Sequence, residues 1–200
     1  MDGTNKNWSR RDFMKMAGAA GVGAVVSPME HLLADGLKSG GMVSAPQQVP
    51  QRPFGHSGVD VSILALGGAQ NFKSKQNLLR QALKMGVTCW DSSRNYIGGN
   101  SEKGIGKYFS KFPEDRKKVF LITKSGKTDP DNLTQHLHES LRRMKIDYIE
   151  LFLIQAVSDV KKEMTDDLRT WAENARAAGK IHFFGFSTHK NMENCLTDAA

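Results

Sequence analysis

Cysteine is scarce in this chain: Cys89 and Cys195 are the only two among 200 residues. Two cysteines exclude a disulfide framework, and neither has the spacing of a metal-binding cluster, so we expect both to be small buried apolar residues. The formal net charge is +7, but the chain lacks a run of positive charge interleaved with aromatic residues. The scattered charge favours solvated faces and a basic amino terminus over a nucleic-acid-binding surface.

The chain also lacks an apolar run long enough to span a bilayer as a helix. Residues 9–15, Ser-Arg-Arg-Asp-Phe-Met-Lys, precede a short, mildly apolar stretch over 16–27 that Pro28 closes. A charged head followed by a short apolar region is typical of a signal peptide, and the paired arginines resemble the bacterial twin-arginine export signal. We therefore expect residues 1–34 to engage the twin-arginine translocation machinery and the protein to be periplasmic or otherwise extracytoplasmic. No A-x-A cleavage pattern is visible, so retention of the signal as a membrane anchor stays open.

Residues 35–51 are rich in Gly, Ser, Pro and Gln and are typical of a linker. Residues 53–62 alternate around a glycine turn and predict a small hairpin. Buried strands are then expected at 63–66, 87–90, 119–123, 149–154 and 182–186, with amphipathic helices between them. Strands separated by helices predict parallel pairing with right-handed crossovers, in a (β/α) barrel or a doubly wound sheet.

Two of the expected strands carry an ionisable residue at the carboxyl end. Asp91 ends one strand, a turn leads from it to Tyr96, and Lys124 ends the next strand. Parallel α/β folds place their chemistry at the carboxyl ends of the strands. The sequence therefore predicts a site that joins these three residues.

Residues 52–200 resemble the first part of the aldo-keto reductases, a (β/α)8-barrel family that uses NADPH. The motifs that carry the resemblance are Leu66-Gly67-Gly68, Asp91-x-x-x-x-Tyr96, Asn100-Ser101-Glu102-x-x-Ile105-Gly106, Lys124, Asp147-Tyr148-Ile149-Glu150-Leu151 and Gly179-Lys180-Ile181 leading to Gly185-Phe186-Ser187. The resemblance implies an α/β fold, a TIM barrel of aldo-keto reductase type. About five βα units are expected of the eight that close such a barrel, so the domain is expected to be truncated at its carboxyl end.

The resemblance also implies NADPH-dependent reduction of a small aldehyde or ketone to an alcohol. Hydride addition leaves an alkoxide that needs a proton donor. A free tyrosine has a pKa of about 10, and a nearby ammonium favours the phenolate. By resemblance, Tyr96 is the acid, Lys124 is its tuning cation, and Asp91 holds Lys124 charged. Ser187 looks like the residue that binds the nicotinamide carboxamide. Thr188 stands where the family often has asparagine in the cofactor site.

Gln155 departs from the family, which usually has an active-site histidine at this position. Its amide can donate a hydrogen bond to a carbonyl oxygen but cannot carry a proton. An exported, non-catalytic binding protein on a decayed or incomplete barrel is therefore the alternative function.

A nucleotide hydrolase is a further possibility, because residues 125–128, Ser-Gly-Lys-Thr, resemble the end of a phosphate-binding loop. Leu121 stands where that motif requires glycine, which disfavours it. A metal site is not expected: His136 and His138 are predicted to be solvated on a helix, and His189 stands alone near the expected cofactor site.

Overall fold

The computed structural model describes residues 48–200. The expected twin-arginine signal, residues 1–34, and the greater part of the expected linker, residues 35–47, lie outside the described residues. Within residues 48–200, no helix combines the length and the apolar character needed to cross a membrane.

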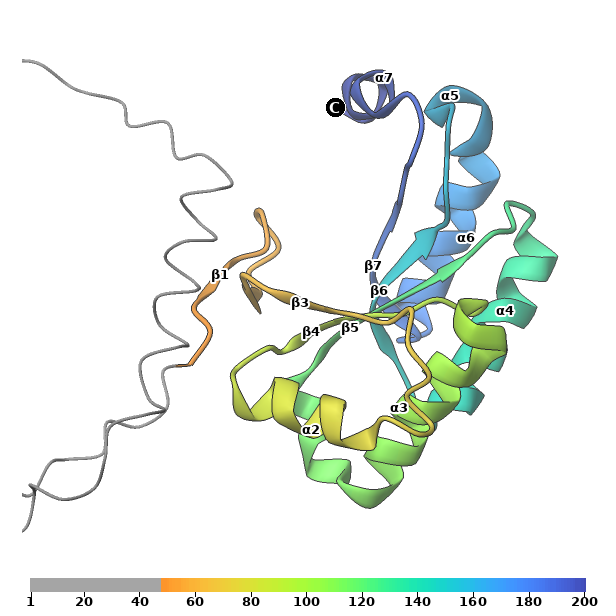
Figure 1. Ribbon diagram of the computed structural model, residues 1–200. Coiled ribbons are helices and arrows are strands. Elements are labelled where there is room, and N and C mark those ends of the chain that lie inside the picture. Colours follow the sequence, from red (N-terminus) through yellow and green to blue (C-terminus); the bar gives the residue numbers. More distant parts are fainter. Residues whose placement is uncertain (1–47) are drawn as a thin grey trace, which may run out of the picture. The chain divides into compact units, whose positions relative to one another are not determined.

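The described part is built on a parallel sheet of five strands (Figure 1). The strands are β3 Ala65–Gly67, β4 Cys89–Asp91, β5 Phe120–Ser125, β6 Ile149–Ile154 and β7 Ile181–Phe186. Their order in the sheet follows their order in the chain, without the reversal that defines a doubly wound sheet. The expected α/β fold is confirmed, and the topology is that of an incomplete (β/α) barrel.

Helices connect each strand to the next and cover the outer face of the sheet (Figure 1). The longer ones are α2 Gln76–Lys84, α3 Asn100–Lys111, α4 Pro130–Met144 and α6 Asp166–Ala177. The shorter ones are η1 Tyr96–Gly99, η2 Pro113–Lys118, α5 Val160–Glu163 and α7 Met192–Ala199. α4 shows why they form. Its buried residues include Leu133, Leu137, Leu141 and Met144 on one stripe, and the Asp129 side chain caps its first turn by accepting from the Asn132 N–H.

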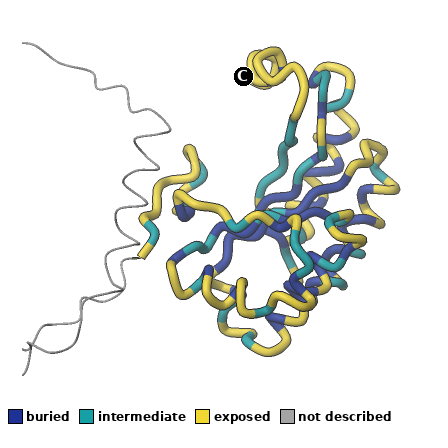
Figure 2. Tube along the Cα trace, viewed as in Figure 1, coloured by how far each residue is buried: buried dark blue, intermediate teal, exposed yellow. Residues whose placement is uncertain are grey.

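The two faces of the sheet carry separate apolar clusters. The larger cluster lies between the sheet and the helices, where Trp90, Leu121 and Phe152 are almost fully buried. Figure 2 shows this burial concentrated along the strands and the inward faces of the helices. The smaller cluster lies on the inner face and contains Cys89, Phe120, Leu151 and Val61.

A hairpin packs onto the amino end of the inner face. It pairs β1 Gln51–Pro53 with β2 Asp60–Ser62 in antiparallel register, which confirms the expected hairpin. In the loop between them, Phe54 places its ring centroid 5.2 Å from that of Phe120 and 5.9 Å from that of Phe183. Through these aromatic contacts the hairpin packs against the amino end of the inner face.

The expectation of a buried strand at residues 63–66 was wrong. Ile63 and Leu64 are 52% and 57% exposed, and β3 begins only at Ala65. These two apolar residues form the connection from the hairpin to the sheet, and β3 pairs only with β4 among the described strands. The other strands fall where expected within two residues at each end, and both cysteines are buried as expected.

Candidate active site

The inner face of the sheet changes from apolar to polar along β4, β5 and β6. On β5 the inward positions are Phe120, Ile122 and then Lys124, because alternate residues of a strand share a face. The same two-residue spacing leads from Cys89 to Asp91 on β4, and from Leu151 through Leu153 to Gln155 on and after β6. A polar group therefore ends each inner row at the carboxyl edge of the sheet.

Lys124 is the buried charge at this edge. Its side chain is 7% exposed, and Nζ forms an ion pair with Asp91 Oδ1 and donates a hydrogen bond of 2.8 Å to the carbonyl oxygen of Ser92. Nζ also lies 5.1 Å from the centroid of the Tyr96 ring. A buried ammonium requires such partners, because an unpaired charge is costly to remove from water. The structure thus brings together Asp91, Tyr96 and Lys124, the three residues that the strand ends predicted.

Tyr96 is held by a tight turn between β4 and α3. Its N–H donates to the carbonyl oxygen of Ser93 at 3.1 Å. The next three residues, Ile97, Gly98 and Gly99, have φ values of 51°, 59° and 81°. This left-handed region suits glycine, but it strains a β-branched residue such as isoleucine. The turn that presents Tyr96 therefore stores local strain.

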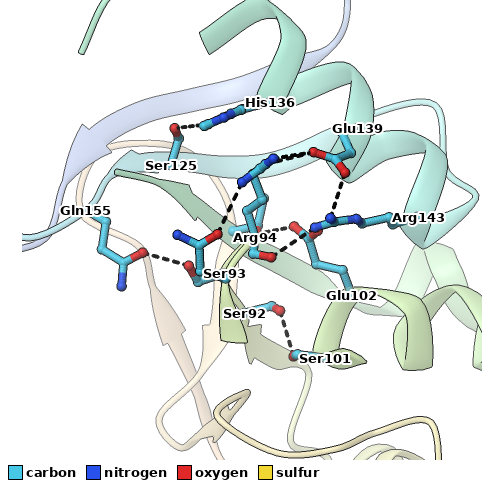
Figure 3. Close-up of polar contacts among 12 residues, drawn as sticks. Ser92, Ser93, Arg94, Ser101, Glu102, Ser125, His136, Glu139, Arg143 and Gln155 are labelled. Carbon is cyan, nitrogen blue, oxygen red and sulfur yellow. Dashed lines mark hydrogen bonds and ion pairs between the residues drawn. The ribbon is translucent and has the colours of Figure 1, made fainter. Parts of the chain in front are cut away.

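Gln155 is oriented by a residue that the sequence did not point to. Ser93 Oγ donates a hydrogen bond of 2.7 Å to Gln155 Oε1 (Figure 3). The backbone N–H of Gln155 donates to the carbonyl oxygen of Ser125 at 2.8 Å. With Oε1 occupied by Ser93, the Nε2 amide is the group that Gln155 can offer to a substrate oxygen. The pair joins two loops that lie 62 residues apart in the chain.

Ser187 and Thr188 follow β7 at the same edge. The N–H of Ser187 donates to the carbonyl oxygen of Ile154 at 2.8 Å, and Ser187 Oγ accepts from the N–H of Ala156 at 3.2 Å. Ser187 therefore lies beside the loop that carries Gln155. Thr188 Oγ1 donates to the carbonyl oxygen of Lys190 at 2.7 Å, so this hydroxyl shapes the loop after β7.

His136 is not solvated, contrary to the expectation. It is buried, and its Nδ1 lies 2.7 Å from Ser125 Oγ (Figure 3). Burial, followed by the positive charge of Arg94, lowers the pKa of His136 below its ordinary value, which favours the neutral ring. His138, two residues along α4, is exposed as expected. His189, which follows β7, is exposed as well.

The Ser-Gly-Lys-Thr segment does not form a phosphate-binding loop. Ser125 Oγ contacts His136 and accepts from the N–H of Lys127 at 3.1 Å. α4 begins only at Pro130, and the carboxylate of Asp129 caps its first turn. A negative side chain therefore occupies the helix end that a phosphate would need.

The sequence of residues 62–199 matches the Aldo/keto reductase family. This match covers more than half of the chain, and the chain belongs to that family.

Known proteins support the assignment. The chain is 30% identical over 151 residues to an aldo-keto reductase of Schizosaccharomyces pombe named for NADP(+), covering 70% of this chain and 42% of the relative. It is 27% identical over 166 residues to a putative voltage-gated potassium channel subunit beta of the same organism, covering 74% and 48%. The chain thus spans less than half the length of these two relatives. Among solved structures, an aldo-keto reductase from Bacillus halodurans in its holo form shares the fold at a TM-score of 0.63 and 23% identity, covering 70% of this chain and 51% of that one.

Proposed function

We propose that this protein reduces a small-molecule aldehyde or ketone to an alcohol with NADPH as the hydride donor. The observation that carries the proposal is the buried Lys124 ammonium, paired with Asp91 and lying beside the Tyr96 ring at the carboxyl edge of the sheet. Membership of the Aldo/keto reductase family and the NADP(+) in the name of one relative support the reaction and the cofactor.

Tyr96, Lys124 and Asp91 are proposed to serve protonation of the substrate, and Gln155 is proposed to orient it. When bound, NADPH supplies the hydride to the carbonyl carbon. The Tyr96 hydroxyl gives its proton to the carbonyl oxygen as negative charge develops there. The Lys124 ammonium lies beside the ring and stabilises the phenolate that this leaves, and Asp91 keeps Lys124 charged and in place. The Nε2 amide of Gln155 donates a hydrogen bond to the same carbonyl oxygen.

The residues at the carboxyl edge fit the nicotinamide end of the cofactor. A carboxamide needs one acceptor and one donor from the protein, and Ser187 offers both in one hydroxyl. The Ala156 N–H holds that hydroxyl at the end of β7, in the loop next to Gln155. Thr188 supports this edge by fixing the loop through Lys190. We assign the nicotinamide contact to Ser187 and the support of its loop to Thr188.

Replacement of the proton donor tests the proposal. Tyr96→Phe should lower kcat for aldehyde reduction by about 10²–10⁴-fold, because it removes the general acid. NADPH affinity, measured by fluorescence titration, should stay within about twofold, since the ring itself is retained. Tyr148→Phe is the matched control, because Tyr148 lies at the amino end of the sheet, next to Ile149 of β6. If Tyr96→Phe reduces aldehydes as fast as Tyr148→Phe, the assignment of the acid is wrong.

A non-catalytic binding protein is the second candidate. Gln155 cannot carry a proton, and one relative is named as a channel subunit rather than a reductase. The same measurements separate the two functions: a folded wild-type protein that neither oxidises NADPH nor binds it would favour the binding protein.

We further propose export by the twin-arginine machinery, on the basis of residues 9–15 and the short apolar stretch that follows them. This route carries folded proteins, which suits a protein that loads its cofactor in the cytoplasm. Cell fractionation of the Arg10→Lys, Arg11→Lys double variant tests it. The variant should stay in the cytoplasm while the unchanged protein reaches the periplasm, and equal distribution would contradict export by this route.

A further inference from the structure

Four charged residues form a network of ion pairs: Arg94, Glu102, Glu139 and Arg143 (Figure 3). We call them the loop clamp. Arg143 Nη2 contacts Glu139 Oε1 at 2.6 Å, and Glu139 Oε2 accepts from Arg94 Nε at 2.8 Å. Arg143 Nη1 also reaches Glu102 Oε2 at 3.2 Å. Two positive and two negative side chains thus balance one another between α3, α4 and the turn.

The buried end of the clamp is anchored to the sheet. The side chain of Glu102 is fully buried, and its Oε1 accepts from Thr123 Oγ1 at 2.8 Å. Thr123 precedes Lys124 on β5 and faces the opposite side of the strand. The clamp therefore ties the turn to the same strand that supplies the active-site ammonium.

Arg143 contacts the chain on both sides of Tyr96. Its Nη1 donates to the carbonyl oxygen of Arg94 at 2.9 Å, two residues before the tyrosine. Three residues after it, a Cβ placed on Gly99 would lie 2.9 Å from the same Nη1, so the guanidinium packs directly against this glycine. One planar, rigid group thus fixes the entry and the exit of the turn.

Arg143 is itself fixed by the packing of α3 against α4. A Cβ on Gly106 would lie 2.1 Å from the carbonyl oxygen of Arg143, so the two helix backbones are in close contact at this point. Arg142, the preceding residue, is exposed and makes no hydrogen bond through its side chain within residues 48–200. Two adjacent arginines therefore differ sharply in their surroundings.

We propose that Arg143 is a positioning residue for the proton donor: it holds the Tyr96 turn so that the ring stays beside Lys124. This inference rests on the proposed function of Tyr96 as the general acid. Without Arg143, the strained left-handed turn at Ile97 loses its contacts at Arg94 and Gly99, and the ring leaves the position beside the ammonium. Catalysis depends steeply on such placement. The effect should fall on kcat, because the clamp contacts neither Gln155 nor Ser187.

Fluorine NMR of protein labelled with 3-fluorotyrosine follows the ring directly. Tyr96, Tyr108 and Tyr148 each contribute one resonance, and Tyr→Phe variants assign them. Arg143→Met should shift or broaden the Tyr96 resonance and leave the other two as in the control Arg142→Met. In the same variant, kcat should fall at least about tenfold, whereas NADPH affinity should stay within about twofold. Arg143→Lys should restore part of kcat, because it returns the charge without the planar fork.

The result that overturns the inference is an Arg143→Met protein with the Tyr96 resonance and kcat of Arg142→Met. If Arg143→Met does not fold, Glu139→Gln takes its place under the same criteria, because this carboxylate joins Arg94 to Arg143 and its side chain is 24% exposed. Failure of the proposed function is distinct: Tyr96→Phe would then keep its activity, while the NMR would still decide whether Arg143 holds the ring.

Discussion

The proposed chemistry depends on single residues at the carboxyl ends of the inward rows of side chains. The side chain of Lys124 is 7% exposed, and its ammonium is paired with Asp91 and the carbonyl oxygen of Ser92. Gln155 depends on Ser93 for the orientation of its side-chain amide. Its two amide ends are similar in shape but opposite in function, and only the hydrogen bond from Ser93 decides which end faces the site.

Loss of the Ser93 hydroxyl should therefore weaken substrate binding. In Ser93→Ala the Gln155 amide is free to rotate, and Oε1 then repels the carbonyl oxygen. One hydrogen bond contributes about 0.5–1.5 kcal/mol, so KM for the carbonyl substrate should rise about two- to tenfold. Steady-state kinetics measures this, with Ser110→Ala as the control. Within residues 48–200, the Ser110 hydroxyl bonds only to its own helix, through the carbonyl oxygen of Gly106. Equal KM values in the two variants would contradict this role of Ser93.

The strand ends in the sequence predicted that Asp91 and Lys124 lie together, because the carboxyl ends of parallel strands meet at one edge. Gln155 came from the family resemblance, and its partner Ser93 was not predicted. Ser93 and the burial of His136 depend on hydrogen bonds between loops and helices, which no local pattern specifies. The i+3 and i+4 spacing of a helix does not show which turn of chain will cover its polar face.

At the scale of elements, the contact between α3 and α4 positions the site from behind. Gly106 allows the α3 backbone to approach the carbonyl oxygen of Arg143. This close approach positions Arg143, which belongs to the loop clamp. The left-handed turn at Ile97, Gly98 and Gly99 then places Tyr96 at the start of η1. A small change between these helices should therefore affect both stability and the site.

Gly106→Ala should lower the free energy of unfolding by about 1–3 kcal/mol, the usual cost of overpacking a close contact. The added Cβ would lie 2.1 Å from a backbone oxygen, so a helix must move. Urea unfolding measures the change. Gly126→Ala is the control, because a Cβ there would meet nothing within 4 Å and Gly126 does not have a positive φ. A Gly106→Ala variant as stable as Gly126→Ala would show that the two helices are not in close contact.

The elements themselves were largely predictable. Residues 149–154, which are apolar except for Glu150, predicted β6 with both ends correct. The prediction of a buried strand at 63–66 was wrong because Ile63 and Leu64 are apolar and lie next to a strand. In the structure they link the hairpin to the sheet and are exposed. Burial of a short apolar pair depends on what packs against it, and that information is not local.

For the whole molecule, strand order decides the architecture. Alternating strands and helices fit both a barrel and a doubly wound sheet, and the uninterrupted order from β3 to β7 selects the barrel topology. The sheet gathers the ends of β4, β5, β6 and β7 at one edge, and the hairpin covers the amino end of the inner face. Family membership and this arrangement together support the proposal that the chemistry takes place at the carboxyl edge.

The most direct test of the central claim is deuterium transfer to a small aldehyde from NADPH that carries deuterium at both C4 positions. The protein expressed from its complete reading frame is incubated with both, and the alcohol is examined by mass spectrometry. We predict an alcohol that carries one deuterium on the former carbonyl carbon, and at least about 10²-fold less of it with Tyr96→Phe. An alcohol without deuterium, no alcohol at all from a folded protein that binds NADPH, or equal labelling by both proteins would contradict the account.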